Sequence, residues 1–202
     1  MGRTTIYING PEDFKILPDS FTEKTILFIT DGEYYINKFP KNAEAEFHGT
    51  SKAIMYGKTR AKFFDSSSFC THEESFAMAY DNSYGFAFGK SKVYFSSEGD
   101  LATLEQGSSF VLSGRKISSR GESTIHLLGK VNEVVLYGDS QLYVDTIEKS
   151  FIMAYNSNSI FLSAELDHEH KILKTSISNK IINAEIIKIV DKVSFLDLLR
   201  KA

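Results

Sequence analysis

The chain has 202 residues and a formal net charge of −3, with lysine and arginine scattered along it, which argues against a nucleic-acid-binding surface. Its single cysteine, Cys70, excludes an internal disulfide framework, and the opening residues lack the apolar run of a signal peptide or membrane span. We therefore expect a cytoplasmic protein, with one domain spanning residues 1–202, because this length suffices for a sizeable core.

Residues 1–24 precede the repeat that dominates the chain. We expect a short strand at Thr4 to Asn9, a turn at Gly10, and a second short strand or helix near Phe14 to Leu17. Because the end of a stack of strands exposes unpaired backbone groups, we interpret this segment as an N-terminal cap.

Six consecutive octads run from Gly49 to Ser96: GTSKAIMY, GKTRAKFF, DSSSFCTH, EESFAMAY, DNSYGFAF and GKSKVYFS. Each begins with glycine or an acidic residue, has Ser or Thr in third place, and then alternates. A short repeat of this kind indicates a solenoid in which each octad forms one strand and one corner. The same frame can be laid over residues 25–170.

The eighth residues of the octads sort into three series when every third octad is compared. Two series are apolar, beginning Tyr56, Tyr80, Leu104 and Phe64, Phe88, Leu112. The third is polar and consists of His48, His72, Ser96, Arg120 and, after one inserted residue near Tyr137, Asp145. We therefore predict an all-β, single-stranded, three-sided parallel β-helix with about 24 residues per coil, and we favour a right-handed one.

Alternation along each strand assigns side chains to the inside or the outside. On the third side the inward pairs are Phe69 with Thr71, Val93 with Phe95, Ile117 with Ser119, and Leu142 with Val144. Glycine and aspartate at the first octad position are expected at corners, where a positive φ is tolerated. The stacked serines should satisfy corner backbone groups: Ser51, Ser75 and Ser123, and Ser67, Ser91 and Ser140.

Residues 171–202 depart from the frame. They contain strand-like stretches and a short amphipathic helix that starts at Ser194, a suitable N-cap. The helix either plugs the last coil or contacts another copy of the chain.

Seven-residue segments such as AMAYDNS at Ala77 to Ser83 and AIMYGKT at Ala53 to Thr59 resemble a known repeat. It is the A-x-A-Y-[GD]-x-S repeat of hypothetical proteins from phages, prophages and gut bacteria. The similarity covers about Ala43 to Ser163. It implies a β-helix and no catalytic residues.

The third side offers a binding surface of polar outward residues: His48, His72, Tyr94, Arg120, Tyr143 and Asp145. Within it, Glu46, His48, Cys70 and His72 would lie on adjacent coils and are zinc-type ligands. Parallel ladder neighbours do not converge on one point, so an ordinary polar face is the competing interpretation. His168 and His170, in an acidic stretch, form a second such cluster, or simply a solvated corner. We expect no cofactor and no bound metal.

The other two sides carry apolar residues at outward positions. This aromatic strip consists of Tyr56, Phe64, Met78, Tyr80, Phe86, Phe88 and Phe110. Exposed apolar area on this scale usually marks an interface, and interfaces favour aromatic residues and Met. Partner binding or self-association, burial at the corners, and a carbohydrate platform all remain open.

No phosphate-binding loop, nucleophile elbow or paired-cysteine motif occurs, and outward carboxylates do not cluster. We therefore expect a non-enzymatic protein that binds a macromolecule, with a phage-encoded inhibitor of a host defence protein as one version. A self-assembling filament or fibre element is the alternative, and a carbohydrate-binding or carbohydrate-active β-helix is the second. Neither a membrane nor nucleic acid is an expected partner.

Overall fold

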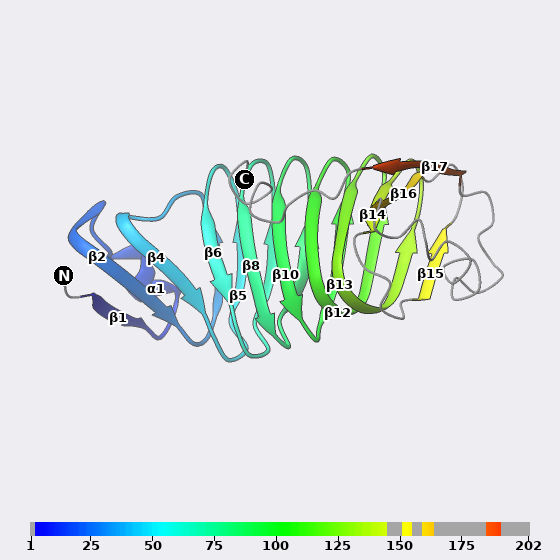
Figure 1. Cartoon of the computed structure of the whole chain (residues 1–202). Coiled ribbons are helices and arrows are strands. Elements are labelled where there is room, and N and C mark those ends of the chain that lie inside the picture. Colours follow the sequence, from blue (N-terminus) through cyan, green and yellow to red (C-terminus); the bar gives the residue numbers. More distant parts are fainter. Residues whose placement is uncertain (1–2, 145–150, 155–158, 164–184, 191–202) are drawn as a thin grey trace.

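The computed structural model describes residues 3–144, 151–154, 159–163 and 185–190. It is an elongated solenoid of about eight turns, whose strands stack along one axis from the N-terminal end (Figure 1). Strand pairings within these residues are all parallel, as in β4 with β6 and β5 with β7. The predicted all-β solenoid is therefore confirmed. Its handedness stays a prediction.

The strands form two layers, which we call the front and back layers as drawn in Figure 1. The front layer contains β1 (Thr4–Ile8), β2 (Ser20–Ile29), β4 (Lys41–Phe47), β6 (Arg60–Phe63), β8 (Phe76–Asp81), β10 (Lys92–Ser97), β14 (Gln141–Val144), β16 (Ser159–Ser163) and β17 (Glu185–Val190). The back layer contains β3 (Glu33–Ile36), β5 (Lys52–Met55), β7 (Ser68–Thr71), β9 (Tyr84–Ala87), β11 (Asp100–Leu104) and β15 (Phe151–Ala154). Two long strands, β12 (Ser108–Arg120) and β13 (Thr124–Leu136), run through both layers.

Strand register sets the length of a coil. Ala45 on β4 lies opposite Ala61 on β6, and Ala53 on β5 lies opposite Phe69 on β7, so neighbouring strands in a layer are sixteen residues apart. A coil therefore contains two octads, and the predicted 24-residue, three-sided coil is wrong. One extra residue does enter the frame, because Ile125 pairs with Leu142, seventeen residues on. It lies between Leu127 and Lys130 and not near Tyr137 as expected, because Val111 pairs with Leu127 but Ser113 pairs with Lys130.

The sizes of the inward side chains explain why each coil has two layers and not three. Small side chains share the core with a few large ones, and Ala45, Ala61 and Ala77 lie one behind another on the front layer. Phe63 of β6 reaches across to Phe69 of β7, with ring centroids 5.0 Å apart. Layers packed about 10 Å apart are filled by such a mixture, whereas a triangular coil encloses a wider prism.

The inward assignments from sequence are confirmed in full. Each member of the four predicted pairs is buried, with at most 3% of its surface exposed: Phe69, Thr71, Val93, Phe95, Ile117, Ser119, Leu142 and Val144. They do not share one side, however. Phe69 and Ile117 belong to the back layer, and Val93 and Leu142 to the front layer.

Corner chemistry also follows the octad. The first position adopts the left-handed conformation at both glycine and carboxylate residues, with φ of 61° at Gly49 and 57° at Glu73. The buried third-position serine bonds back across the corner, as where the Ser67 hydroxyl donates to the Phe64 carbonyl at 2.6 Å. Carboxylates link successive coils, since Gly57 N–H donates to Glu73 Oε2 at 2.7 Å.

The N-terminal segment continues the stack instead of standing apart from it. β1 pairs in parallel with β2, with Thr4 opposite Thr25. The short helix α1 (Pro11–Lys15) carries Phe14, whose ring lies edge-on to Tyr34 at 5.8 Å and to Phe39 at 6.0 Å. This aromatic group packs against the first residues of the core. The helix predicted from Ser194 lies outside the described residues.

Candidate functional site

The eighth octad residues line the two edges where the layers meet, and they stack in ladders. On one edge His72 lies flat between Tyr56 and Phe88, with ring centroids 4.9 Å away on each side. On the other edge, Phe64 lies flat between His48 at 4.8 Å and Tyr80 at 5.1 Å. These rings are half-buried against one another, so the corner-burial interpretation holds for these six aromatic and histidine positions.

The ring ladders at the edges show that the predicted grouping of residues into three sides is wrong. Tyr56 and Tyr80, expected on neighbouring coils of one side, lie on opposite edges, and so do His48 and His72. A period of 24 follows only when histidine is grouped with the polar residues. Imidazole is flat and stacks with phenyl and phenol rings, so it belongs in an aromatic ladder.

The predicted zinc cluster is also split. Glu46 and His48 belong to the front layer and its edge, whereas Cys70 and His72 belong to the back layer and the opposite edge. Within the described part of the chain, no three His, Cys, Asp or Glu residues are grouped as metal ligands would be. His168, His170 and Asp145 lie outside that part.

The remaining predicted binding residues are distributed over both layers. Met78, Tyr94 and Phe110 follow one another along one outward row of the front layer, and Tyr143 comes after His126 in the same row. Phe86 lies on the back layer, and Arg120 is exposed at the end of β12. Neither the aromatic strip nor the polar face is therefore one continuous surface.

One pair from the predicted cluster does meet. Cys70 Sγ lies 3.2 Å from His72 Nε2. Burial raises the pKa of the Cys70 thiol, so the thiol is protonated near neutral pH and the pair does not resemble the thiolate of a catalytic cysteine. The contact fixes the His72 ring within its ladder.

The back layer carries a hollow of about 300 Å³. Ile54, Ser68 and Cys70 line it, with Tyr84 and Phe86 from the next coil beside them. Tyr35, two coils before Cys70 along the same row, is 68% exposed, Tyr84 is 44% exposed, and Phe86 is 48% exposed. We call this surface the aromatic hollow. Of its three exposed rings, only Phe86 was singled out from sequence.

Gly85 belongs to the inner row of β9, beneath the hollow. Gly85 lies opposite Phe69 in the register, and the Phe69 ring fills the space that a residue 85 side chain would need. A Cβ at Gly85 would lie 2.5 Å from Phe69 Cδ2 and would also collide with the Phe69 carbonyl oxygen. Glycine at this position leaves room in the core for the Phe69 ring, while Tyr84 and Phe86 point outward on either side of Gly85 and line the hollow.

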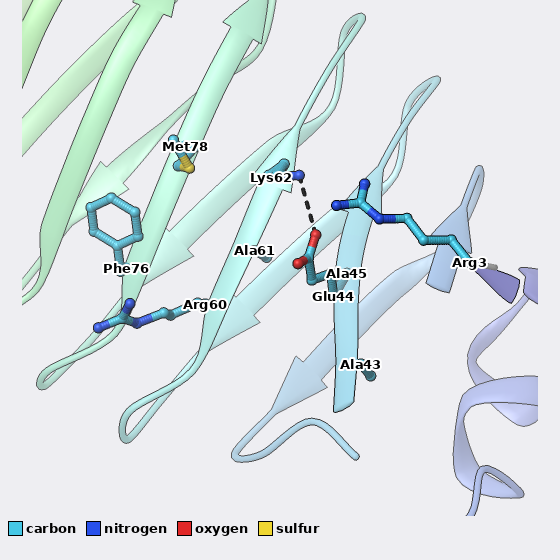
Figure 2. A pocket seen from close by; sticks show the side chains of 9 residues that line it. All are labelled: Arg3, Ala43, Glu44, Ala45, Arg60, Ala61, Lys62, Phe76 and Met78. Atoms are coloured by element: carbon cyan, nitrogen blue, oxygen red, sulfur yellow. Dashed lines mark hydrogen bonds and ion pairs between the residues drawn. The ribbon is translucent and has the colours of Figure 1, made fainter. Parts of the chain in front are cut away.

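The front layer has a second concavity, of about 500 Å³, over β4, β6 and β8 (Figure 2). Its lining combines three cations, one carboxylate and an apolar surface: Arg3, Arg60, Lys62, Glu44, Ala43, Ala45, Ala61, Phe76 and Met78. We call it the cationic groove. Sequence reasoning missed it, because Arg3 lies outside the repeat and approaches only through the pairing of β1 with β2.

Farther along the front layer a third ring ladder forms. His126 lies flat between Phe110 and Tyr143, with centroids 4.8 Å away on each side. Burial lowers the pKa of His126 to about 4, so this imidazole is neutral at physiological pH. This part of the layer is closed, since Phe110 is only 6% exposed.

No family model, curated protein or solved structure matches this chain. Among the described residues, no helix has the length and apolar character needed to cross a membrane.

Proposed function

We propose that the protein is a non-enzymatic binding protein whose aromatic hollow holds a protein partner. The observation that carries this proposal is the exposure of Tyr84 and Phe86 in the lining of a depression of the back layer, with Tyr35 exposed next to Ile54 in the same row. Tyrosine and phenylalanine are enriched at the centres of protein interfaces, where a few buried aromatic anchors contribute most of the affinity.

The hollow also indicates what the partner presents. A volume of about 300 Å³ with an apolar floor at Ile54 and Cys70 suits a single aromatic or aliphatic anchor side chain. Glu33 and Lys52 at the rim provide one charge of each sign. The complementary surface is therefore an apolar anchor within a polar ring of mixed charge.

The hydrogen bonds of the corner carboxylates support a binding role over catalysis. The carboxylates of Asp65, Glu73 and Glu105 accept hydrogen bonds from corner amides of neighbouring coils, which gives them a structural task. The narrower version, a phage-encoded inhibitor of a host protein acting in the cytoplasm, is supported by the octad resemblance alone.

The test compares Phe86→Ser with Tyr137→Ser, which removes a similarly exposed ring elsewhere. Each tagged protein is used to capture partners from a lysate of its own organism, and any stoichiometric partner is then purified and titrated. We expect binding to survive in Tyr137→Ser and to weaken at least about tenfold in Phe86→Ser, the effect of an interface hot spot.

Other outcomes would replace the proposal. Self-association of the wild type in sedimentation, lost in Phe86→Ser, would make the hollow an assembly interface and favour a filament or fibre element. Specific binding to a glycan array, lost in the same variant, would favour the carbohydrate reading. A purified partner that binds both variants equally would remove the hollow from the interaction.

A further inference from the structure

We infer that the outer edge of β1 is a binding site for a second copy of this chain, in which two β1 strands pair antiparallel about a two-fold axis and join two front layers into one. β1 belongs to the front layer and shares no residue with the aromatic hollow of the back layer. This inference therefore does not rest on the proposed function.

Among the described residues, β1 has a neighbouring strand on one side only. It pairs in parallel with β2, and Figure 1 shows it at the N-terminal end of the front layer. The back layer is covered at the same end, because α1 packs the Phe14 ring against Tyr34 of β3. An uncovered strand edge presents a row of N–H and C=O groups that can pair with another chain.

Hydrogen bonds farther along the front layer show how the backbone groups of a strand are divided between its two neighbours. The Ile29 carbonyl accepts from the His48 N–H at 2.7 Å, and the Phe47 carbonyl accepts from the Phe64 N–H at 2.8 Å. The inward residues of a strand therefore direct their backbone groups to the following coil. The outward residues between them direct theirs to the preceding coil, because backbone groups alternate along a strand.

The same division identifies the free groups of β1. Ile8 lies opposite Ile29 in the register and is the inward residue of its strand, so Ile8 and Ile6 direct their backbone groups to β2. Thr5 and Tyr7 then direct an N–H and a C=O each toward the outer edge. Asn9 would be next, but its N–H already donates to Asp13 Oδ2 at 2.9 Å. The edge open to pairing is therefore centred on Ile6.

The sequence of β1 contains little that would block such pairing. The strand reads TTIYI, without a charged residue or a proline, and its register with β2 has no bulge. Thr5 is exposed, and Tyr7 is 65% exposed. Charges, proline and bulges are the usual protection of edge strands, so another strand meets no repulsion here.

An antiparallel pair centred on Ile6 uses all the free groups of Thr5 and Tyr7. Thr5 of one copy lies opposite Tyr7 of the second copy, and the two-fold axis repeats this pair. Each pair exchanges both of its N–H···O bonds, because both residues face the partner strand. The two side chains are on the outer surface, where an aromatic ring opposite a β-branched residue is favourable. Such a contact closes after two copies.

Charge favours a second copy over an unrelated extended peptide. In this register Arg3, which is exposed, lies opposite Asn9 of the second copy. The hydrogen bond from Asn9 holds the Asp13 carboxylate beside that end of the strand through Oδ2. Arg3 of each copy therefore approaches Asp13 of the other, and the attraction occurs at both ends of the pairing.

Sedimentation equilibrium of the full-length protein over a range of concentrations tests the inference. We expect a monomer–dimer equilibrium that stops at two copies. Thr5→Pro removes an N–H that faces the second copy, and proline is tolerated where an edge strand directs its N–H to solvent. This variant should weaken the dimer at least about tenfold, because two hydrogen bonds are lost across the axis. Thr5→Val keeps the N–H and should dimerise like the wild type. Circular dichroism verifies that both variants fold.

A disulfide tests the register without any proline. In a Cys70→Ser background, which removes the native thiol, Ile6→Cys should place two cysteines across the axis with Cα atoms about 4.5 Å apart, close enough for a disulfide. Thr4→Cys is the matched control, because its two copies would be more than about 13 Å apart. Oxidation should link Ile6→Cys into covalent dimers and leave Thr4→Cys as single chains.

Four results would overturn the inference. They are a monomer at all concentrations up to about 1 mM, where even a small interface of this kind should form, a dimer that Thr5→Pro does not weaken, equal cross-linking of Ile6→Cys and Thr4→Cys, and growth beyond two copies. Loss of the dimer in Phe86→Ser with retention in Thr5→Pro would give the second of these results and place the contact at the aromatic hollow. Because partner capture is measured separately, either site can fail while the other stands.

Discussion

The aromatic hollow and the cationic groove occupy equivalent places on two layers built from the same octad. Both lie over strands with a small residue at the fifth position, Gly85 in the hollow and Ala61 in the groove. The fourth and sixth positions differ, with Tyr84 and Phe86 beside the hollow and Arg60 and Lys62 beside the groove. The inner rows therefore maintain the solenoid, and the outer rows are free to acquire different chemistry.

The largest expected effect is a loss of stability in Gly85→Ala, a change in the core beneath the back layer. The new Cβ would collide with the ring and the carbonyl oxygen of Phe69, and we expect a loss of about 3 kcal/mol in the free energy of unfolding. Urea denaturation measures it. Gly10→Ala is the matched control, because a Cβ there meets nothing within 4 Å.

A second variant sharpens this prediction. Phe69→Leu removes the ring that blocks residue 85, so the double variant should be more stable than the sum of the two single changes implies. Strict additivity would mean that the Phe69 ring does not set the requirement for glycine.

The next largest effect should be the pH dependence of stability that His126 causes in the closed ring ladder of the front layer. The unfolded chain protonates His126 near pH 6.5, but the folded chain does so only near pH 4. The contribution of the neutral His126 to the free energy of unfolding is therefore present above pH 6.5 and is lost as the pH falls toward 4, by about 3 kcal/mol.

His126→Phe keeps a flat ring between Phe110 and Tyr143 and removes the titrating group. The urea midpoint of this variant should fall less than that of the wild type between pH 7 and pH 4.5. Carboxylates contribute equally to both proteins, so the difference isolates His126. Identical pH profiles would contradict the burial of this imidazole.

The smallest effect should come from charge on the outer row of the back layer. Arg115 binds Asp100 through two hydrogen bonds, of 2.9 and 2.7 Å, and this contact lowers the pKa of Asp100. Both side chains are exposed, so Arg115→Gln should change the free energy of unfolding by less than about 0.5 kcal/mol. A larger change would show that outer rows also maintain the solenoid.

Local chemistry was predictable because each part of the octad acts within a few residues. Alternation placed Phe69 and Val93 inside, the third-position serines bond across their own corners, and the first position accepts a positive φ. None of these features depends on how many octads complete a turn.

The candidate sites were much less predictable. Phe86 was singled out, but Tyr35 and Tyr84 were missed because only register shows that they flank the same depression. Arg3 and Arg60 are fifty-seven residues apart in sequence, and the stacking of β1, β2, β4 and β6 brings them to one groove.

By itself, the sequence determined a parallel solenoid of octads, with its corners and its inward rows, because these follow from alternation and turn chemistry within one strand and one corner. Only the tertiary structure decided that two octads close a coil and which outward residues become neighbours. The physical reason is that the number of strands per coil depends on how wide a core the inward side chains can fill, and on which flat rings stack at the edges. Both are properties of many coils packed together.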